Sequence, residues 1–142
     1  MLRGIDPLLT PGLLHTMASM GHGDRIAIVD ANFPGASNAQ RLHELPGLDA
    51  GSVLRAVLSL LPLDDFVPDP AVTMQVVGDA GTIPEAVQDF TVILGAHDAP
   101  APTTVERFAF YELAKSAYAI VQTGETRLYG NIIIAKGVIK PF

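Results

Sequence analysis

The sequence has no cysteine and few charged residues. Without cysteine, disulfide bonds, thiolate nucleophiles and zinc–thiolate sites are excluded. Charged residues make up 17% of the chain, whereas soluble domains average about 25%. Hydrophobic residues make up 49%, and a small domain has little interior in which to bury so many. The composition therefore favours a homo-oligomer over an unusually apolar monomer.

Basic residues are scarce as well. Nine Lys and Arg stand against fifteen Asp and Glu, which gives a net charge of −6. The basic residues are scattered, so no stripe for nucleic-acid phosphates is expected. No apolar run approaches the ~20 residues of a membrane span, and the first residues lack the apolar core of a signal peptide. We therefore expect a cytoplasmic protein with no nucleic-acid or membrane partner, folded as a single domain over residues 1–142.

Helix-like and strand-like segments alternate along most of the chain. Helices are predicted at 11–20, 50–61, 84–94 and 108–116, and strands at 25–29, 40–45, 71–77, 103–107, 118–122 and 132–135. This alternation predicts an α/β domain with a mainly parallel sheet. The last two strands follow one another without a helix, so a different local pairing is expected there. Gly21 is expected to end the first helix in a left-handed conformation.

One candidate site stands at the start of the first predicted strand. His22 lies between Gly21 and Gly23, and the apolar strand 25–29 that follows ends on Asp30. Glycines let a ligand approach the backbone, and histidine titrates near neutral pH. An acid just beyond an apolar strand occupies the position where α/β folds place ligand contacts.

Two later stretches contain further polar and aromatic candidates. Arg107 lies at a strand-to-helix junction, and Tyr111 lies one helical turn further on. The tripeptide Tyr129-Gly130-Asn131 precedes the last strand and offers a hydroxyl, an open backbone and a carboxamide. These groups suit a sugar-sized polyol. In the alternative interpretation the tyrosines are core or interface aromatics, and Arg107 pairs with a neighbouring glutamate.

No metal site or cofactor is expected. Three acids lie among prolines without the ordered spacing of a cation-binding loop: Asp64, Asp65 and Asp69. We expect them in a solvated loop. His15 precedes His22 by seven residues, but no third ligand follows. His43 and His97 lie in polar segments and are expected to be exposed.

Five stretches in order resemble a known family. They are Met20-Gly-His-Gly-Asp24, Asp30-Ala-Asn-Phe-Pro34, Arg107-Phe-Ala-Phe-Tyr-Glu112, Thr123-Gly-Glu125 and Tyr129-Gly-Asn131. Over essentially its whole length the chain resembles the RbsD/FucU family of D-ribose pyranases and L-fucose mutarotases, and more closely its fucose branch. Asn32 occupies a variable position of the second stretch, so the preferred sugar stays open.

The resemblance implies a three-layer, Rossmann-like α/β subunit that assembles into higher oligomers, commonly decameric rings. It implies interconversion of the anomers or ring forms of a monosaccharide. His22 matches the catalytic histidine of the family, and Tyr111 falls where a further substrate contact is expected. The positions that match its sugar-binding residues are Asp30, Arg107, Tyr129, Gly130 and Asn131.

The predicted mechanism is general acid–base ring opening with His22 as the acid/base. Two alternatives remain: a ribose-type pyranase, and a non-catalytic monosaccharide-binding or transport-accessory protein. At roughly 3.3 Å per residue, the strand between His22 and Asp30 separates them by on the order of 20 Å. We therefore expect His22 to act in the site of a neighbouring subunit, at a subunit interface.

Overall fold

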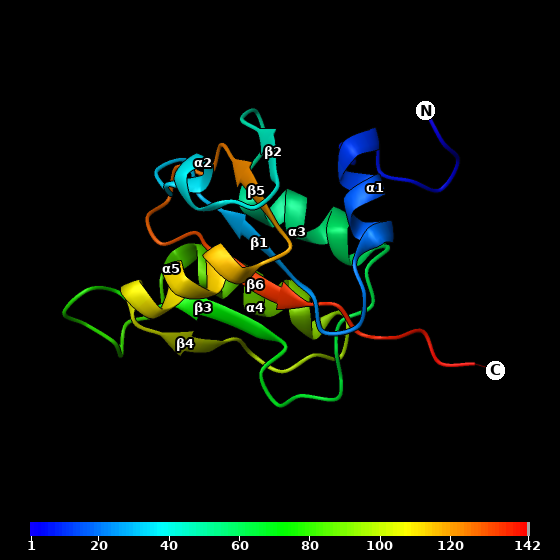
Figure 1. Ribbon diagram of the computed structural model, residues 1–142. Helices are drawn as coiled ribbons and strands as arrows, with labels where there is room; N and C mark the ends of the chain where they lie inside the picture. The colour runs from blue at the N-terminus through cyan, green and yellow to red at the C-terminus, as the bar shows by residue number, and fades with distance from the viewer. Residues whose placement is uncertain (142) are drawn as a thin grey trace.

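The computed structural model describes residues 1–141 and contains one six-stranded sheet. Its strands are β1 (Arg25–Val29), β2 (Leu42–Leu45), β3 (Ala71–Met74), β4 (Thr103–Val105), β5 (Ala119–Thr123) and β6 (Ile132–Ala135). The strand order is β2-β5-β1-β6-β3-β4 (Figure 1). Strand β6 runs antiparallel to β1 and β3, and the other pairs are parallel. The mainly parallel sheet is confirmed, and so is the different pairing at the end of the chain.

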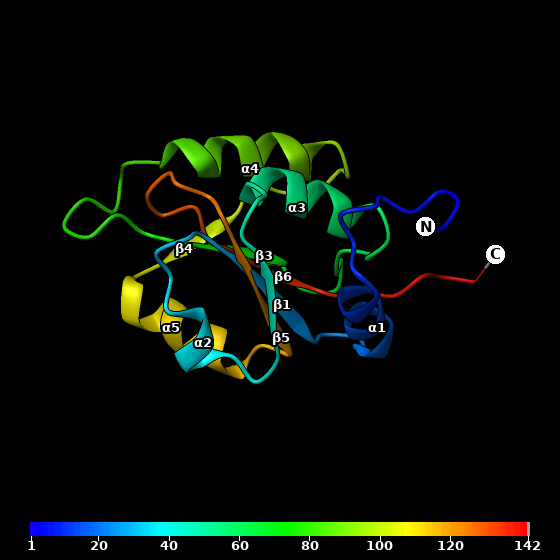
Figure 2. The same cartoon turned by 90° about the horizontal axis from the view of Figure 1, so that it is seen from above.

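Five helices accompany the sheet in the described residues: α1 (Pro11–Ser19), α2 (Gly35–Asn38), α3 (Ala50–Leu58), α4 (Glu85–Gly95) and α5 (Arg107–Ser116). Seen from above, α3 and α4 cover one face of the sheet, and α5 with the short α2 covers the other (Figure 2). This arrangement confirms the α/β fold with helices on both faces of a central sheet.

Strand β1 shows why the sheet is covered on both sides. Ile26 and Ile28 pack into the cluster that includes α3 and α4, whereas Ala27 and Val29 pack into the cluster that includes Phe110 of α5. All four side chains are buried, as expected for a strand between two helical layers. Each large aliphatic side chain stabilises the fold by about 1.5–3 kcal/mol.

Side-chain caps fix the starts of α1, α3 and α5. The Thr10 hydroxyl accepts from the Leu13 N–H at 3.2 Å, and the Asp49 carboxylate accepts from the Ser52 N–H at 2.8 Å. Glu106 caps α5 in the same way, at 2.6 Å from the Ala109 nitrogen. Helix α5 therefore begins at Arg107, one residue before its predicted start.

The end of α1 differs from the prediction. Met20 is extended, and Gly21 is not among the residues with positive φ; Gly23 is, at φ +86°. The Lys136 ammonium donates to the carbonyls of Met17 and Met20, so a side chain satisfies the free carbonyls that a left-handed cap would otherwise satisfy. The prediction for Gly21 was wrong.

Two other local predictions were wrong. Helix α2 lies where no helix was predicted, and Asn38 there donates its side-chain amide to the Pro34 carbonyl at 2.7 Å. His43 is only partly exposed, and its Nε2 shares a 2.8 Å hydrogen bond with the Thr16 hydroxyl. Burial lowers the pKa of His43.

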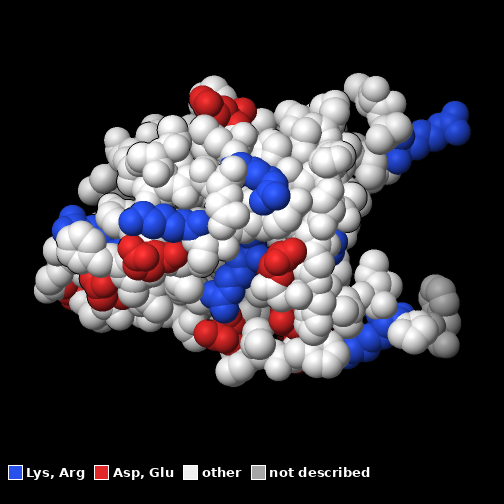
Figure 3. All heavy atoms as spheres, viewed as in Figure 1, with Lys and Arg blue, Asp and Glu red and all other residues white. Residues whose placement is uncertain are grey.

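Charges are mixed on the face shown in Figure 3, where Lys and Arg lie among Asp and Glu. Within residues 1–141, none of the helices combines the length and apolarity needed to cross a bilayer.

Candidate functional site

A cavity of about 220 Å³ opens at the carboxyl ends of β1 and β3. Its lining comprises Asp30, Asn32, Phe33, Met74, Val77, Arg107, Tyr111, Leu128, Tyr129 and Asn131. Because β6 is antiparallel, the start of β6 reaches the end of the sheet where β1 and β3 finish. The cavity thus gathers five predicted site residues from segments about a hundred positions apart, and it is small enough for a single sugar ring.

Asp30 is fixed by backbone donors. Its Oδ1 accepts from the Asn32 N–H at 3.0 Å and its Oδ2 from the Gly130 N–H at 3.2 Å. Its own N–H donates to the side-chain oxygen of Asn131 at 2.8 Å. Burial raises the pKa of Asp30, and the hydrogen bonds that its carboxylate accepts from Asn32 and Gly130 partly oppose the rise. Asp30 therefore presents an oriented, buried acceptor to the cavity, and Gly130 acts through its backbone.

The tripeptide before β6 adopts a demanding conformation. Tyr129 has φ +58°, in the left-handed region that costs a side-chain-bearing residue about 1–3 kcal/mol. Its hydroxyl accepts from the Val77 N–H at 3.1 Å. A Cβ at Gly130 would lie 2.7 Å from Cγ of Glu125, so the chain passes too close to Glu125 for any side chain.

Arg107 lines the cavity. Within residues 1–141 its buried Nε has no hydrogen-bond partner, and its guanidinium lies 4.6 Å from the centre of the Phe108 ring. Glu106 caps α5 and Glu112 pairs with Lys115 at 3.2 Å. The structure thus contradicts the alternative in which Arg107 pairs with a neighbouring glutamate, and it leaves guanidinium donors available for a ligand.

Tyr111 and Tyr129 each contact both the core and the cavity. Both pack against the core cluster on the α5 face, and both line the cavity. The Phe33 ring lies edge-on to Tyr111, with centres 5.4 Å apart. Both tyrosine rings therefore lie at the cavity wall with the core packed behind them.

His22 lies elsewhere, in the turn that precedes β1. Its Nε2 lies 3.1 Å from Oδ1 of Asp64, and its ring centre lies 4.9 Å from that of Phe66. The His22 side chain is 42% exposed, whereas that of Asp64 is 3% exposed. His22 is not part of the cavity lining, so a single chain does not bring it together with the other predicted site residues.

The prediction that the acidic loop is solvated was wrong for Asp64, which is buried. Besides His22, it accepts from the Phe66 N–H at 3.0 Å. Burial opposes ionisation of Asp64, but the hydrogen bonds from Phe66 and His22 and the charge of Arg25 hold its pKa below the usual value. An aspartate that accepts from the N–H two residues later forms a turn that the local sequence can indicate. The contact between Asp64 and His22 joins positions 42 residues apart, so the local sequence does not indicate it.

A partly buried ion pair supports the loop before β6, and it was not predicted from the sequence. Glu125 is 4% exposed and lies 2.9 Å from Nη2 of Arg127, whose Nη1 reaches Asp89 of α4 at 2.6 Å. The hydrogen bonds from Arg127 lower the pKa of Glu125. The pair ties this loop to α4 and holds the chain just before Tyr129.

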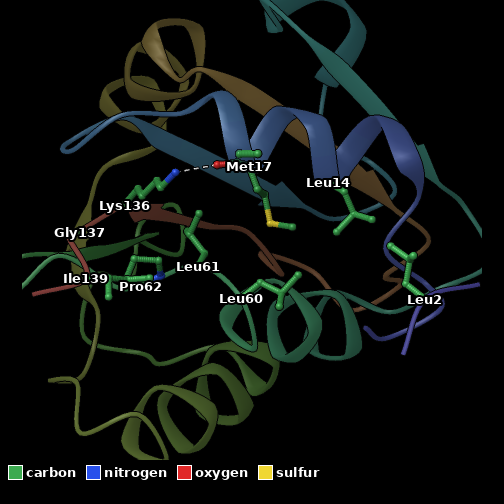
Figure 4. Close-up of a pocket in the computed structure, with 10 residues that line it drawn as sticks. Leu2, Leu14, Met17, Leu60, Leu61, Pro62, Lys136, Gly137 and Ile139 are labelled. Carbon is green, nitrogen blue, oxygen red and sulfur yellow. Dashed lines mark hydrogen bonds between the residues drawn. The ribbon is translucent and has the colours of Figure 1, made fainter. Parts of the chain in front are cut away.

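Another cavity is lined almost entirely by apolar side chains. A cavity of about 560 Å³ lies between α1, the end of α3 and the segment after β6 (Figure 4). Its lining is Leu2, Leu14, Met17, Ala18, Leu60, Leu61, Pro62, Lys136, Gly137 and Ile139. Its one charged group, the Lys136 ammonium, already binds two carbonyls. Within residues 1–141 no group of three His, Asp or Glu is arranged to hold a metal ion.

The fold and the first cavity define an α/β protein with a small-ligand site at the carboxyl ends of its strands. The chain belongs to the RbsD / FucU transport protein family, whose family model matches residues 3–139. It is 43% identical to the fucose mutarotase of Bos taurus, over 99% of this chain and 95% of that protein. It is 40% identical to the L-fucose mutarotase of Histophilus somni, over 97% of each.

A solved structure agrees with these relatives. The chain is similar to the fucose mutarotase from Streptococcus pneumoniae in complex with L-fucose, with a TM-score of 0.92 and 40% sequence identity. The match covers 98% of this chain and 100% of that one. The similarity therefore extends through both ends of β1, where His22 and Asp30 lie.

Proposed function

We propose that the protein is a sugar mutarotase, an isomerase that interconverts the anomers of L-fucose or a similar monosaccharide. The observation that carries the proposal is the cavity in which Asp30, Arg107, Tyr111, Tyr129 and Asn131 converge. It combines fixed acceptors, free guanidinium donors and aromatic walls in a volume suited to one sugar ring. The relatives named above are fucose mutarotases, which supports the assignment of the substrate.

The reaction needs two proton transfers. A base removes the proton of the anomeric hydroxyl, the bond between the anomeric carbon and the ring oxygen breaks, and an acid protonates that oxygen. The open-chain carbonyl turns and the ring closes on its other face by the reverse steps. No electron is gained or lost, and no cofactor is required. Positioned acid–base catalysis contributes about 10²–10⁴-fold.

We assign His22 as the acid/base. Its Nε2–H donates to Asp64, which leaves the lone pair of Nδ1 available to take a proton. Asp64 does not line the cavity and is a positioning residue. Because His22 lies at the far end of β1 from the cavity, we infer that it reaches the cavity of a neighbouring subunit. The proposed assembly is a cytoplasmic homo-oligomer, of the decameric ring type suggested by the family.

The other residues hold the sugar. Asp30 accepts from a sugar hydroxyl, and the free donors of Arg107 bind sugar oxygens. Tyr111, Tyr129 and Asn131 contact the remaining hydroxyls and ring faces. Gly130 fixes Asp30 through its N–H and leaves space for the loop.

Exchange NMR tests this function. Wild-type protein is expected to accelerate α–β exchange of L-fucose, and a parallel measurement on D-ribose separates a mutarotase from a ribose-type pyranase. His22→Ala should lose the acceleration while still binding L-fucose in a titration. Equal exchange rates in wild type and His22→Ala would mean a sugar-binding protein without this catalysis.

A further inference from the structure

A second polar cavity adjoins the proposed sugar site. It has a volume of about 370 Å³ and is lined by residues 75–80 after β3 and residues 106–108 at the start of α5. Val77 and Arg107 line both cavities. The two hollows are therefore neighbours divided by these side chains, and nothing in the single-ring function uses the second one.

The second cavity offers hydrogen-bonding groups of both kinds. Gln75, Asp79 and Glu106 lie in its wall, and Arg107 adds the guanidinium whose buried Nε has no hydrogen-bond partner among the described residues. Because two carboxylates stand against one guanidinium, an anionic ligand such as a phosphate is disfavoured. A neutral polyol satisfies both donors and acceptors.

The wall also presents an aromatic surface. Phe108 is 61% exposed although it is a large apolar side chain, and the Arg107 guanidinium lies against its ring. An exposed aromatic beside polar groups fits a ligand with both apolar ring faces and hydroxyls. A pyranose ring has this character.

The division between the cavities is held in place. The Val77 N–H donates to the Tyr129 hydroxyl, and the following turn is closed by the Asp79 N–H donating to the Val76 carbonyl at 3.0 Å. Gly78 occupies this turn at φ +76°. The second cavity is therefore tied through Tyr129 to the proposed sugar site.

We propose that the second cavity binds a second, neutral sugar unit, so that the site accepts a reducing disaccharide. The reducing ring occupies the first cavity and undergoes the same opening and closing, while the attached ring lies against Phe108. The bond between the two units is neither formed nor broken. This inference rests on the proposed function, because the attached ring is useful only if the reducing end is the substrate.

The test uses synthetic disaccharides in which D-galactose is joined to O2, O3 or O4 of L-fucose. Exchange NMR with the wild-type protein is expected to show accelerated anomer exchange for at least one of them. Ala80→Tyr places a large ring in the second cavity from its exposed rim. It should lower the acceleration of that disaccharide about tenfold or more, because the added ring clashes with the second sugar, and should leave L-fucose exchange unchanged.

Ala101→Tyr is the matched control, because Ala101 is exposed at the amino end of β4 and the second cavity adjoins its carboxyl end. It should leave both substrates unaffected. The inference is overturned if L-fucose exchange is accelerated and none of the disaccharides is, as when a neighbouring subunit fills the second cavity. It is also overturned if Ala80→Tyr slows both substrates equally. Failure to accelerate L-fucose itself would instead count against the proposed function.

Discussion

His22 and Asp30 lie at opposite ends of the same central strand. Three residues after His22 the chain enters β1, and Asp30 follows its last residue. At the Asp30 end are the sugar-sized cavity and the start of β6, whereas the His22 end has Asp64 and Phe66. The proposed catalytic unit is therefore a pair of surfaces from two chains.

Mixed oligomers should reveal this arrangement. His22→Ala and Arg107→Met are each expected to be inactive, since one lacks the acid/base and the other the sugar donors. After the two proteins are dissociated, mixed equally and reassembled, roughly a quarter of interfaces combine an intact His22 with an intact cavity. Exchange NMR should then show restored activity of that order. Absence of any recovery in reassembled mixtures would place both halves in one subunit.

Asp64 is expected to act through His22. Asp64→Asn should lower kcat by about tenfold or more, because the histidine loses the carboxylate that orients it, which is part of the acid–base contribution. KM should change little, since Asp64 does not line the cavity. Asp65→Asn is the control: Asp65 is exposed and pairs with Lys140 on the surface. A rise in KM without loss of kcat in Asp64→Asn would contradict the assigned role.

The Glu125–Arg127 pair should matter for both stability and binding. Arg127→Met leaves a buried carboxylate without its partner and should cost about 2 kcal/mol of unfolding free energy, less than a fully buried pair because Arg127 keeps 28% exposure. The loop before Tyr129 loosens as well, so KM for the sugar should rise. Urea denaturation and exchange kinetics measure the two effects. Lys115→Met, which removes an exposed pair with Glu112, should change neither quantity measurably.

His43 should make stability depend on pH. Burial lowers the pKa of His43 in the folded protein from the ordinary 6.5. Between the folded and the unfolded pKa, the unfolded chain therefore binds a proton that the folded chain does not. Its stabilising contribution is present above the unfolded pKa and is lost as pH falls through the folded pKa. Urea denaturation at about pH 8 and about pH 5 should therefore show a smaller difference between wild type and His43→Gln at the lower pH. A difference that is the same at both would exclude the effect.

Local physics made much of the fold predictable. The apolar strand predicted at 25–29 was confirmed, and the caps at Thr10 and Asp49 likewise depend only on neighbouring residues. The end of α1 was not predictable in this way, because Lys136 satisfies its carbonyls from 116 positions away. Where a distant side chain completes a local structure, the local pattern alone misleads.

The same limit applies to the site. Asp30 and Arg107 each follow a strand, so the sequence could place both at one edge, because parallel strands finish at the same edge of the sheet. Asn131 joins them because β6, whose start it precedes, is antiparallel. The burial of Asp64 was not predicted, because an acid among prolines is usually solvated and only the fold brings His22 into contact with it. No local sequence pattern indicated that Arg127 would bridge Glu125 to α4.

Strand β6 has a further consequence for how the protein forms. It is the last strand in the chain, yet it lies between β1 and β3 and is the only strand that connects them in the sheet of the described residues. Before it is synthesised, the β2-β5-β1 and β3-β4 portions have no shared hydrogen-bonded ladder. Strand β6 therefore completes the sheet under the cavity, because it joins the β1 end, which carries Asp30, to the β3 end, which carries Met74.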